Sequence, residues 1–235
     1  MRKKAFLLLG LIVMSLPAFG GGIQAGNQLI SIGLGASGPT GSSGLRFQDV
    51  LPNDYGTMKL DWGDGGFAYN IQYLIALLPF LAIGVEAGGN NFGWAEHNRM
   101  RWSTGMQWDY TTLKTRMDVY SLLAAGRFTI FPSESGRIYI PFGIGKAFSK
   151  ATVDVNTKQY NPFLINEIDN RLSESFSSFT YYVGLGWEAE TQENVFIGIE
   201  GRYQGFQFDY GKFSDGLPKK NLSFLSLMVR LGYKF

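Results

Sequence analysis

Cysteine is missing from this sequence of 235 residues, and histidine occurs once, at His97. Without cysteine the chain has no disulfide framework, no cysteine-rich zinc site, no thiol nucleophile and no acylated-cysteine lipid anchor. A single histidine among scattered acidic residues is weak ligation for a metal ion. We therefore predict neither a metal site nor a bound cofactor.

Long hydrophobic runs are also lacking. The longest apolar segment in the body of the chain, 74–82, is interrupted by Pro79 and falls well short of the ~20 residues that a membrane helix needs. Any membrane crossing must therefore use strands, and these must close into a barrel because unpaired backbone groups in hydrocarbon are costly. The 31 glycines and 15% aromatic residues suit a closely packed β-protein.

Residues 1–25 have the three-part form of a secretory signal peptide. Basic residues at 2–4 precede an apolar run at 5–16, and small residues follow, so we predict cleavage near Ala25. Cleavage there removes three of the 21 basic residues and no acidic residue, so 18 basic and 19 acidic residues remain. The expected mature chain, 26–235, is thus nearly neutral and has no broad electrostatic attraction to nucleic acid.

The last stretch, 222–235, alternates with a period of two. Every odd position from Leu225 onward is apolar, ending in Leu231, Tyr233 and Phe235, while the even positions include serine, arginine, glycine and lysine. A half-buried strand shows this pattern. We predict a strand with one face toward lipid and one toward a polar interior.

Seven earlier segments alternate in the same way. The fourth is less regular, so we place only its part after Tyr120 in the membrane. We expect the part before Tyr120 to project into water or to contain a bulge. Lys146 falls on the lipid-facing parity and would have to extend toward the interface. The predicted strands are 27–36, 66–74, 80–89, 117–130, 138–149, 178–190 and 195–205. Their connections alternate between short turns and long polar loops, the predicted loops being 37–65, 90–112, 150–177 and 206–221.

Together these features resemble the small outer-membrane barrels of the OmpA and OmpX type. The resemblance implies an all-β, eight-stranded antiparallel up-and-down transmembrane barrel in the outer membrane of a Gram-negative bacterium. Its expected partners are outer-membrane lipid, lipopolysaccharide and the barrel assembly machinery, which reads the terminal Leu231, Tyr233 and Phe235 as a signal. Because nothing follows Phe235, the peptidoglycan-binding domain of OmpA is not expected.

Six charged residues fall on the inward parity, namely Glu86, Arg127, Glu188, Glu200, Arg202 and Arg230. In a soluble sheet they would form the wet face. The interior of an eight-stranded barrel is only wide enough to be filled by side chains, so there they must pair with one another. We predict a salt-bridged plug around Glu200 and Arg230, with Glu86 or Glu188 as a further partner.

Aromatic and arginine residues gather in the predicted loops. This mixture can bind glycans, proteins or lipopolysaccharide, and it can equally form the interfacial girdle of a barrel. The residues are Trp62, Phe92, Trp94, Trp102, Trp108 and Tyr110, interleaved with Arg99 and Arg101.

We predict a non-enzymatic protein with an envelope or surface-interaction role carried by its outer loops, where an extracellular ligand would bind. One alternative is a narrow channel or transporter for small or hydrophobic solutes, resembling OmpW. Another is a lipid-modifying enzyme with His97 as general base, although Arg99 stands where lipid A deacylases have the serine of a His-x-Ser pair. A soluble lipocalin-like barrel is a further alternative.

Overall fold

The computed structural model describes most of the chain beyond the expected signal segment. The described residues are 23–40, 45–46, 59–60, 65–103, 107–131, 136–161, 164–191, 194–209 and 219–235. The predicted signal peptide therefore lies outside them up to residue 22.

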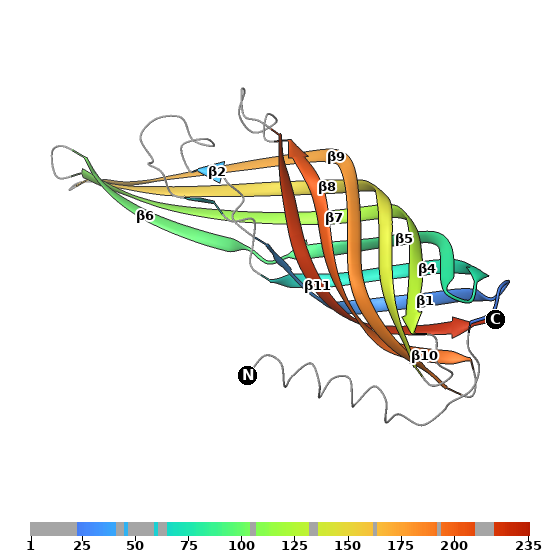
Figure 1. Cartoon of the computed structure of the whole chain (residues 1–235). Coiled ribbons are helices and arrows are strands. Elements are labelled where there is room, and N and C mark those ends of the chain that lie inside the picture. The colour runs from blue at the N-terminus through green and yellow to red at the C-terminus, as the bar shows by residue number, and fades with distance from the viewer. Residues whose placement is uncertain are drawn as a thin grey trace, which may run out of the picture.

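Nine strands form a single antiparallel sheet in the order β5-β4-β1-β11-β10-β9-β8-β7-β6, and the pairing of β5 with β7 closes it (Figure 1). The closed ring contains eight strands, while β6 continues the sheet beside β7. The strands are β1 (Gln28–Pro39), β4 (Gly66–Leu78), β5 (Leu81–Phe92), β6 (Ala95–Ser103), β7 (Gln107–Phe131), β8 (Arg137–Asn161), β9 (Leu164–Glu190), β10 (Val195–Asp209) and β11 (Lys219–Lys234). A separate ribbon pairs β2 (Leu45–Arg46) with β3 (Lys59–Leu60).

The eight-stranded antiparallel barrel predicted from the sequence is thus confirmed. Each predicted membrane segment falls on a different strand of the ring, and the strand ends near the short turns agree within a few residues. We call the end of the barrel that holds residue 235 and the β4–β5 turn the base. The register there joins β1 to β11, with the Gln28 and Phe235 backbones exchanging hydrogen bonds of 2.8 and 3.0 Å.

Alternation of side chains explains why these segments form strands. From Phe224 onward in β11 the odd positions are exposed and the even positions are buried, as a closed sheet with an apolar outside requires. Arg230 lies between Gly33 on one neighbouring strand and Gly198 on the other. A Cβ at Gly198 would lie 2.4 Å from the Trp187 carbonyl oxygen, so both strand spacing and lumen volume favour glycine there.

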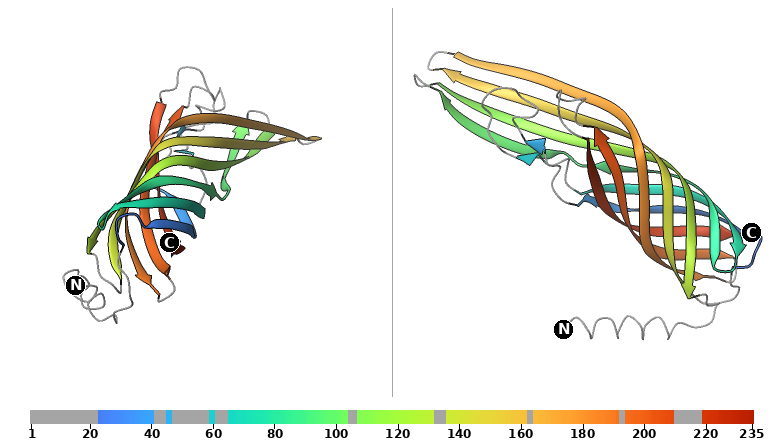
Figure 2. Two further views of the ribbon diagram at one scale, coloured as in Figure 1. Left: turned by 90° about the vertical axis from the view of Figure 1, so that its right-hand side faces the viewer. Right: turned by 45° about the horizontal axis from the view of Figure 1, so that its top comes forward.

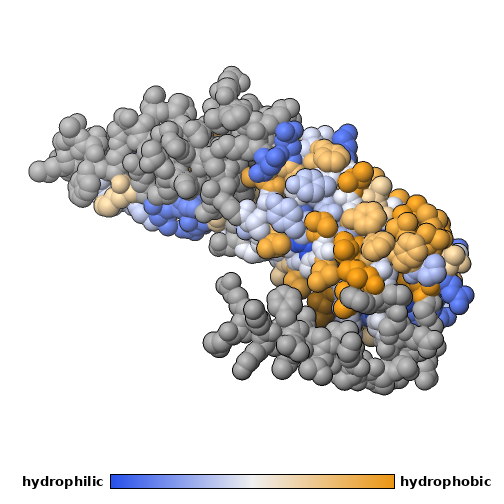
Figure 3. Space-filling view, in the orientation of Figure 1, coloured by the Kyte–Doolittle hydropathy of each residue, from blue (hydrophilic) through white to orange (hydrophobic). Residues whose placement is uncertain are grey.

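The outside of the ring is apolar and exposed, which is the reverse of a soluble protein. Leu227 and Phe179 each keep 62% of their surface exposed, and apolar side chains gather on the face of the barrel that is visible in Figure 3. Such a continuous surface fits a lipid environment. In the described part of the chain, no helix is long and apolar enough to cross a membrane.

Two of the predicted loops are wrong. Segments 90–112 and 150–177 are largely strand, because β7 and β8 run for 25 residues and β9 for 27. Together with β6 they continue far beyond the ring (Figures 1 and 2). We call this part, formed by β6 with residues 107–119, 150–161 and 164–177, the projection.

The loop prediction failed because it counted polar residues without separating the two faces. In the projection the outward parity is polar, with Lys114 and Asp154, while the inward parity is apolar, with Leu113 and Val153 both fully buried. The strand period therefore continues although the outer face has changed from apolar to polar. The other two predicted loops, 37–65 and 206–221, lie mainly outside the described residues, apart from the strand ends and the β2–β3 ribbon.

Candidate functional site in the barrel lumen

Buried charged side chains fill the middle of the barrel. The described residues place five basic and four acidic side chains in the interior, each less than 9% exposed, so the charges nearly balance. They are Arg127, Arg137, Arg202, Arg230, Lys234, Glu86, Glu188, Glu190 and Glu200. All six charges predicted from the inward parity are in this set.

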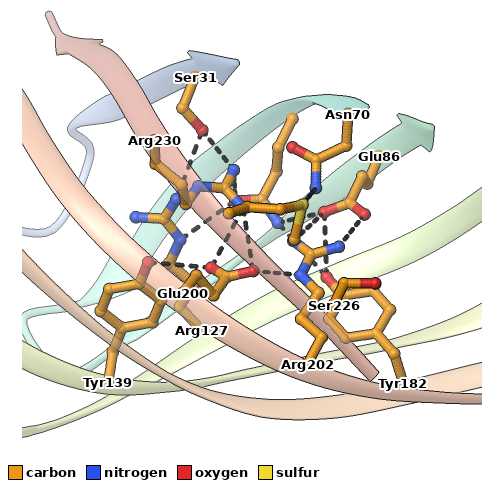
Figure 4. A network of polar contacts seen from close by, with 12 residues as sticks. Ser31, Asn70, Glu86, Arg127, Tyr139, Tyr182, Glu200, Arg202, Ser226 and Arg230 are labelled. Atoms are coloured by element: carbon orange, nitrogen blue, oxygen red, sulfur yellow. Dashed lines mark hydrogen bonds and ion pairs between the residues drawn. The ribbon is translucent and has the colours of Figure 1, made fainter. Parts of the chain in front are cut away.

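Glu200 is the centre of the arrangement. Both of its oxygens lie 3.1 Å from Nη1 of Arg230, a second arginine, Arg202, donates to it through Nε, and the hydroxyl of Tyr139 donates to it at 2.9 Å. The carboxylate and the Arg230 side chain are both fully buried. Figure 4 shows the partner side chains converging on Glu200. Such a pair persists in a low-dielectric interior only because its hydrogen-bonding capacity is largely satisfied.

Glu86 supplies the second carboxylate to Arg202. The two Nη atoms of Arg202 donate to the two oxygens of Glu86, one of them at 2.7 Å, and Gln72 and Tyr182 donate to the same carboxylate at 2.9 and 3.1 Å. The guanidinium of Arg202 also stacks 4.1 Å from the centre of the Tyr182 ring. Arg202 therefore joins two carboxylates that come from strands on different sides of the barrel.

A second pair of carboxylates lies nearer the base. Glu188 accepts from Arg127 at 2.8 Å and from Arg137 at 3.0 Å, and Glu190 accepts from Arg137 at 2.6 Å. Lys234 also pairs with Glu190. Glu188 is therefore not a partner of Arg230, and of the two further partners considered from the sequence, Glu86 is the one that joins the Glu200 group through Arg202.

Neutral polar side chains connect the two groups. Oε1 of Gln72 accepts from Arg127 and from Arg230, each at 3.1 Å, and the hydroxyl of Ser31 accepts from Arg230 at 2.6 Å. The Arg127 guanidinium lies 4.6 Å from the centre of the Tyr139 ring. The charged residues thus form one continuous network across the lumen.

Sequence reasoning missed several members of this network. Glu190 and Lys234 were on the inward parity of their strands, as were the neutral partners, so parity alone could have found them. Arg137 was assigned to a turn, and its position one residue before an alternating segment hid its inward direction. The neutral partners missed were Ser31, Gln72, Tyr139 and Tyr182.

An apolar layer lies between the charged network and the projection. The Phe224 ring packs 5.4 Å from Phe92 and 6.1 Å from Phe206, and all three are almost fully buried. This layer continues along the inward face of the projection through Leu113, Val153 and their neighbours in one cluster. The lumen is therefore filled first by ion pairs and then by aromatic rings.

The tip of the projection carries a row of large side chains on its outward face. The register places Trp108, Tyr160 and Ile165 next to one another across β7, β8 and β9. Trp108 and Tyr160 stack with ring centres 3.7 Å apart, and Ile165 is 65% exposed. Met100, which pairs with Tyr110 two residues nearer the barrel, is 50% exposed.

The other aromatic residues singled out in the sequence are distributed differently. Phe92 is part of the buried layer, Trp94 is exposed between β5 and β6, and Tyr110 lies in the projection. Trp62 lies outside the described residues. Arg99 and Arg101 are on β6.

The structure offers little support for chemistry at His97. It lies on β6, half-buried and in register with Leu113, and the strand carries it into the projection. Among the described residues, no group of three or more histidine and acidic side chains could hold a metal ion.

Comparison with known proteins gives one family and several solved structures. The sequence model of the outer membrane protein beta-barrel domain matches residues 6–235. The attachment invasion locus protein Ail of Yersinia pestis, crystallised with the heparin analogue sucrose octasulfate, is 19% identical with a TM-score of 0.44, covering 90% of this chain and all of Ail. OprG of Pseudomonas aeruginosa is 13% identical with a TM-score of 0.46, covering 91% and 98%. Neisserial surface protein A is 14% identical with a TM-score of 0.42, covering 90% and 98%. No curated protein matches the chain.

Proposed function

Because the chain belongs to the outer membrane protein beta-barrel family and is a β-barrel of the bacterial outer membrane, we propose that it is a non-enzymatic surface-interaction protein. In this proposal the barrel is a closed anchor, and the projection is the part that contacts ligands outside the cell. The base then faces the periplasm, as the short turns and the position of residue 235 suggest.

The length of three strands carries the proposal. A tilted strand crosses a bilayer in ~9–11 residues, whereas β7, β8 and β9 have 25, 25 and 27. The excess forms a hydrogen-bonded sheet rather than a loose loop, with β8 and β9 paired as far as Asn161 and Leu164. A sheet of this length holds its tip well away from the membrane surface.

The outward face of the projection has the composition of a contact surface. Exposed large apolar residues in one place mark interaction sites, and at the tip the exposed Ile165 and Met100 lie near the stacked, half-buried rings of Trp108 and Tyr160. Rows of paired charges follow toward the barrel, such as Lys158 with Glu167 at 3.6 Å and Lys114 with Glu96 at 3.4 Å. A polar, charge-paired surround with an aromatic centre is typical of protein and glycan recognition.

The filled lumen supports an anchor rather than a solute path. A conducting barrel needs a continuous aqueous route, and here the charged network and the Phe92–Phe206–Phe224 layer occupy the interior in series. The network also uses its carboxylates in ion pairs with arginine, which leaves no identifiable catalytic base among them.

The proposal is tested by removing the tip and leaving the barrel intact. In a tip-trimmed chain, residues 100–110 and 158–167 are each replaced by a two-residue turn. Native and tip-trimmed proteins in nanodiscs are applied to arrays of glycans and of extracellular proteins. We expect the native chain to bind a defined subset and the tip-trimmed chain to lose it.

A matched control keeps the tip and changes the barrel. Ile144→Ala alters a lipid-facing residue that is 58% exposed, far from the tip, and should leave binding unchanged. Equal binding by the native and tip-trimmed chains would contradict a role for the tip, as would an absence of binding in every array.

A further inference from the structure

Lys146 is a charged side chain on the lipid-facing surface of the barrel. It is exposed on β8, in register with Leu122 on one side and Phe179 on the other, which are 59% and 62% exposed. Ile144, the preceding outward residue on the same strand, is 58% exposed. A lysine in such a surface is strongly destabilising at the bilayer midplane and nearly neutral near the interface, so the depth of Lys146 decides its energetic cost.

The strand geometry places Lys146 near one edge of the apolar band. At ~3.3 Å per residue and a tilt of ~40°, it lies roughly 20 Å from Ile138, the first outward residue of β8 at the base. The apolar band of such barrels is ~25 Å tall. Lys146 is therefore in the part of the band nearest the projection, within reach of the headgroups of that leaflet.

The Lys146 side chain also points toward the projection. The Lys146 ammonium lies 5.9 Å from the centre of the Phe148 ring, the next outward residue toward the projection. Tyr120 is in register with Phe148 and 45% exposed, so the two aromatic rings mark the interfacial girdle at this level. Lys146 thus extends along the girdle toward the headgroup region.

A second lysine follows on the same face. Lys150 is exposed four residues further along β8, beyond Phe148. Asp118 lies opposite Lys150 in the register, but Arg116 and Asn91 both donate to the Asp118 carboxylate at 3.1 Å. Among the described residues, neither Lys146 nor Lys150 forms an ion pair. Two ammonium groups that form no ion pair with the described residues therefore lie on the same face at the level of the headgroups.

We propose that Lys146 and Lys150 form a binding site for the phosphate groups of the outer-leaflet glycolipid. Lys146 reaches its phosphate from the acyl-chain side and Lys150 from the solvent side, while Phe148 and Phe179 pack against the acyl chains. An anionic phosphate at this level offsets the cost of placing Lys146 in an apolar surface. The proposal concerns the side of the barrel and does not depend on ligand binding at the tip.

The test measures lipid retention by the barrel in phosphatidylcholine nanodiscs. Native mass spectrometry counts bound lipid after addition of phosphorylated lipid A, dephosphorylated lipid A or phosphatidylglycerol in separate experiments. The variants are Lys146→Gln, Lys150→Gln and the double substitution. Lys158→Gln is the matched control because Lys158 is an exposed lysine on the same strand but near the tip and paired with Glu167.

We expect phosphorylated lipid A to be retained by the native chain and by Lys158→Gln. Each of the two site substitutions should lower its apparent affinity about fivefold, and the double substitution should reduce it to the level of dephosphorylated lipid A. Equal retention by the native and double-substituted chains would overturn the proposal. Equal retention of phosphatidylglycerol and phosphorylated lipid A would overturn the assignment to the glycolipid.

Discussion

Glu200 is the residue on which the interior depends most. It is fully buried and holds Arg202, Arg230 and the Tyr139 hydroxyl at once. Replacing such a carboxylate leaves buried guanidinium groups without counter-charge, which costs more than the pair itself contributes. Glu86 remains bound to Arg202, so the uncompensated charge falls mainly on Arg230.

We predict that Glu200→Ala lowers the free energy of unfolding by about 3–5 kcal/mol, measured by urea titration in lipid vesicles. Glu200→Gln should also destabilise the barrel, because it keeps the shape but not the charge. Glu167→Ala, which removes an exposed partner of Lys158, is the control and should change little. A Glu200→Ala chain as stable as the native one would show that the arginines are not buried as described.

Phe235 combines two roles at the closure of the ring. Its backbone pairs with Gln28, and its ring is 54% exposed and stacks with Tyr233 at 6.1 Å. We predict that Phe235→Ala, which keeps the backbone bonds, strongly reduces the amount inserted in the outer membrane. Phe148→Ala removes another exposed aromatic residue and should insert normally. Normal outer-membrane levels of Phe235→Ala would contradict an assembly signal that reads this ring.

At the scale of the element, the projection shows what the sequence could and could not predict. Alternation identified every membrane segment because the lipid-facing parity is apolar and the lumen-facing parity is polar or small. In β7 before Tyr120, where the strand enters the projection, the polarity of the two faces reverses. Polar Lys114 lies on the outward face there and apolar Leu113 on the inward face. These segments were predicted as loops because they contain many polar residues, although their side chains continue to alternate with the period of a strand.

The buried apolar cluster decides how far the projection can be shortened without loss of stability. The tip-trimmed chain should fold as well as the native chain, because it retains the buried face up to Thr157. Replacing residues 151–174 by a two-residue turn instead removes Val153 and Val155 and uncovers Leu113 and Met117. At ~1.5–3 kcal/mol for each buried aliphatic side chain, that chain should lose about 3 kcal/mol or more in urea unfolding. Equal stability of the two shortened chains would show that the cluster does not stabilise the fold.

Two carboxylates on the outward face of the projection give it a pH dependence. The hydrogen bond from Asn98, followed by Lys114, holds the pKa of Glu96 below its usual value of 4.5. The hydrogen bond from Asn156, followed by Lys158, likewise lowers the pKa of Glu167. A lowered pKa means that the stabilising contribution is present above the usual value and is lost as the pH falls through the lowered one.

We therefore predict that these carboxylates titrate below pH 4.5 in the native chain, as followed by carboxyl carbon NMR shifts. Asn98→Ala should raise the midpoint of Glu96 and leave that of Glu167 unchanged, and Asn156→Ala should do the reverse. Midpoints at the usual value in the native chain would mean that the amide contacts do not form in solution.

For the whole molecule, the sequence predicted the class of architecture better than its internal organisation. Closure into eight strands followed from period, turn spacing and the cost of unpaired backbone in lipid. The network of ion pairs did not follow as directly, because parity places a side chain in the lumen without giving its partner. Glu188, for example, has the expected direction but pairs with Arg127 and Arg137, the second of which lay in a predicted turn.

The same limit applies to the aromatic residues. Phe92 and Trp108 were both assigned to a loop, so parity gave no partner for Phe92, which closes the lumen with Phe206 and Phe224, or for Trp108, which stacks on Tyr160 at the tip. Their different positions depend on how far β7, β8 and β9 extend. The division into a filled anchor and a long projecting sheet is therefore a property of the whole chain.

Conductance across a planar bilayer tests this division most directly, since it asks whether the lumen is filled. The native protein should give no steady ion current at moderate voltage, because the ion pairs and the phenylalanine layer occupy the lumen in series. The tip-trimmed chain should be equally silent, since its barrel is unchanged. Large, stable single-channel currents from the native protein would contradict the closed barrel and favour a channel instead.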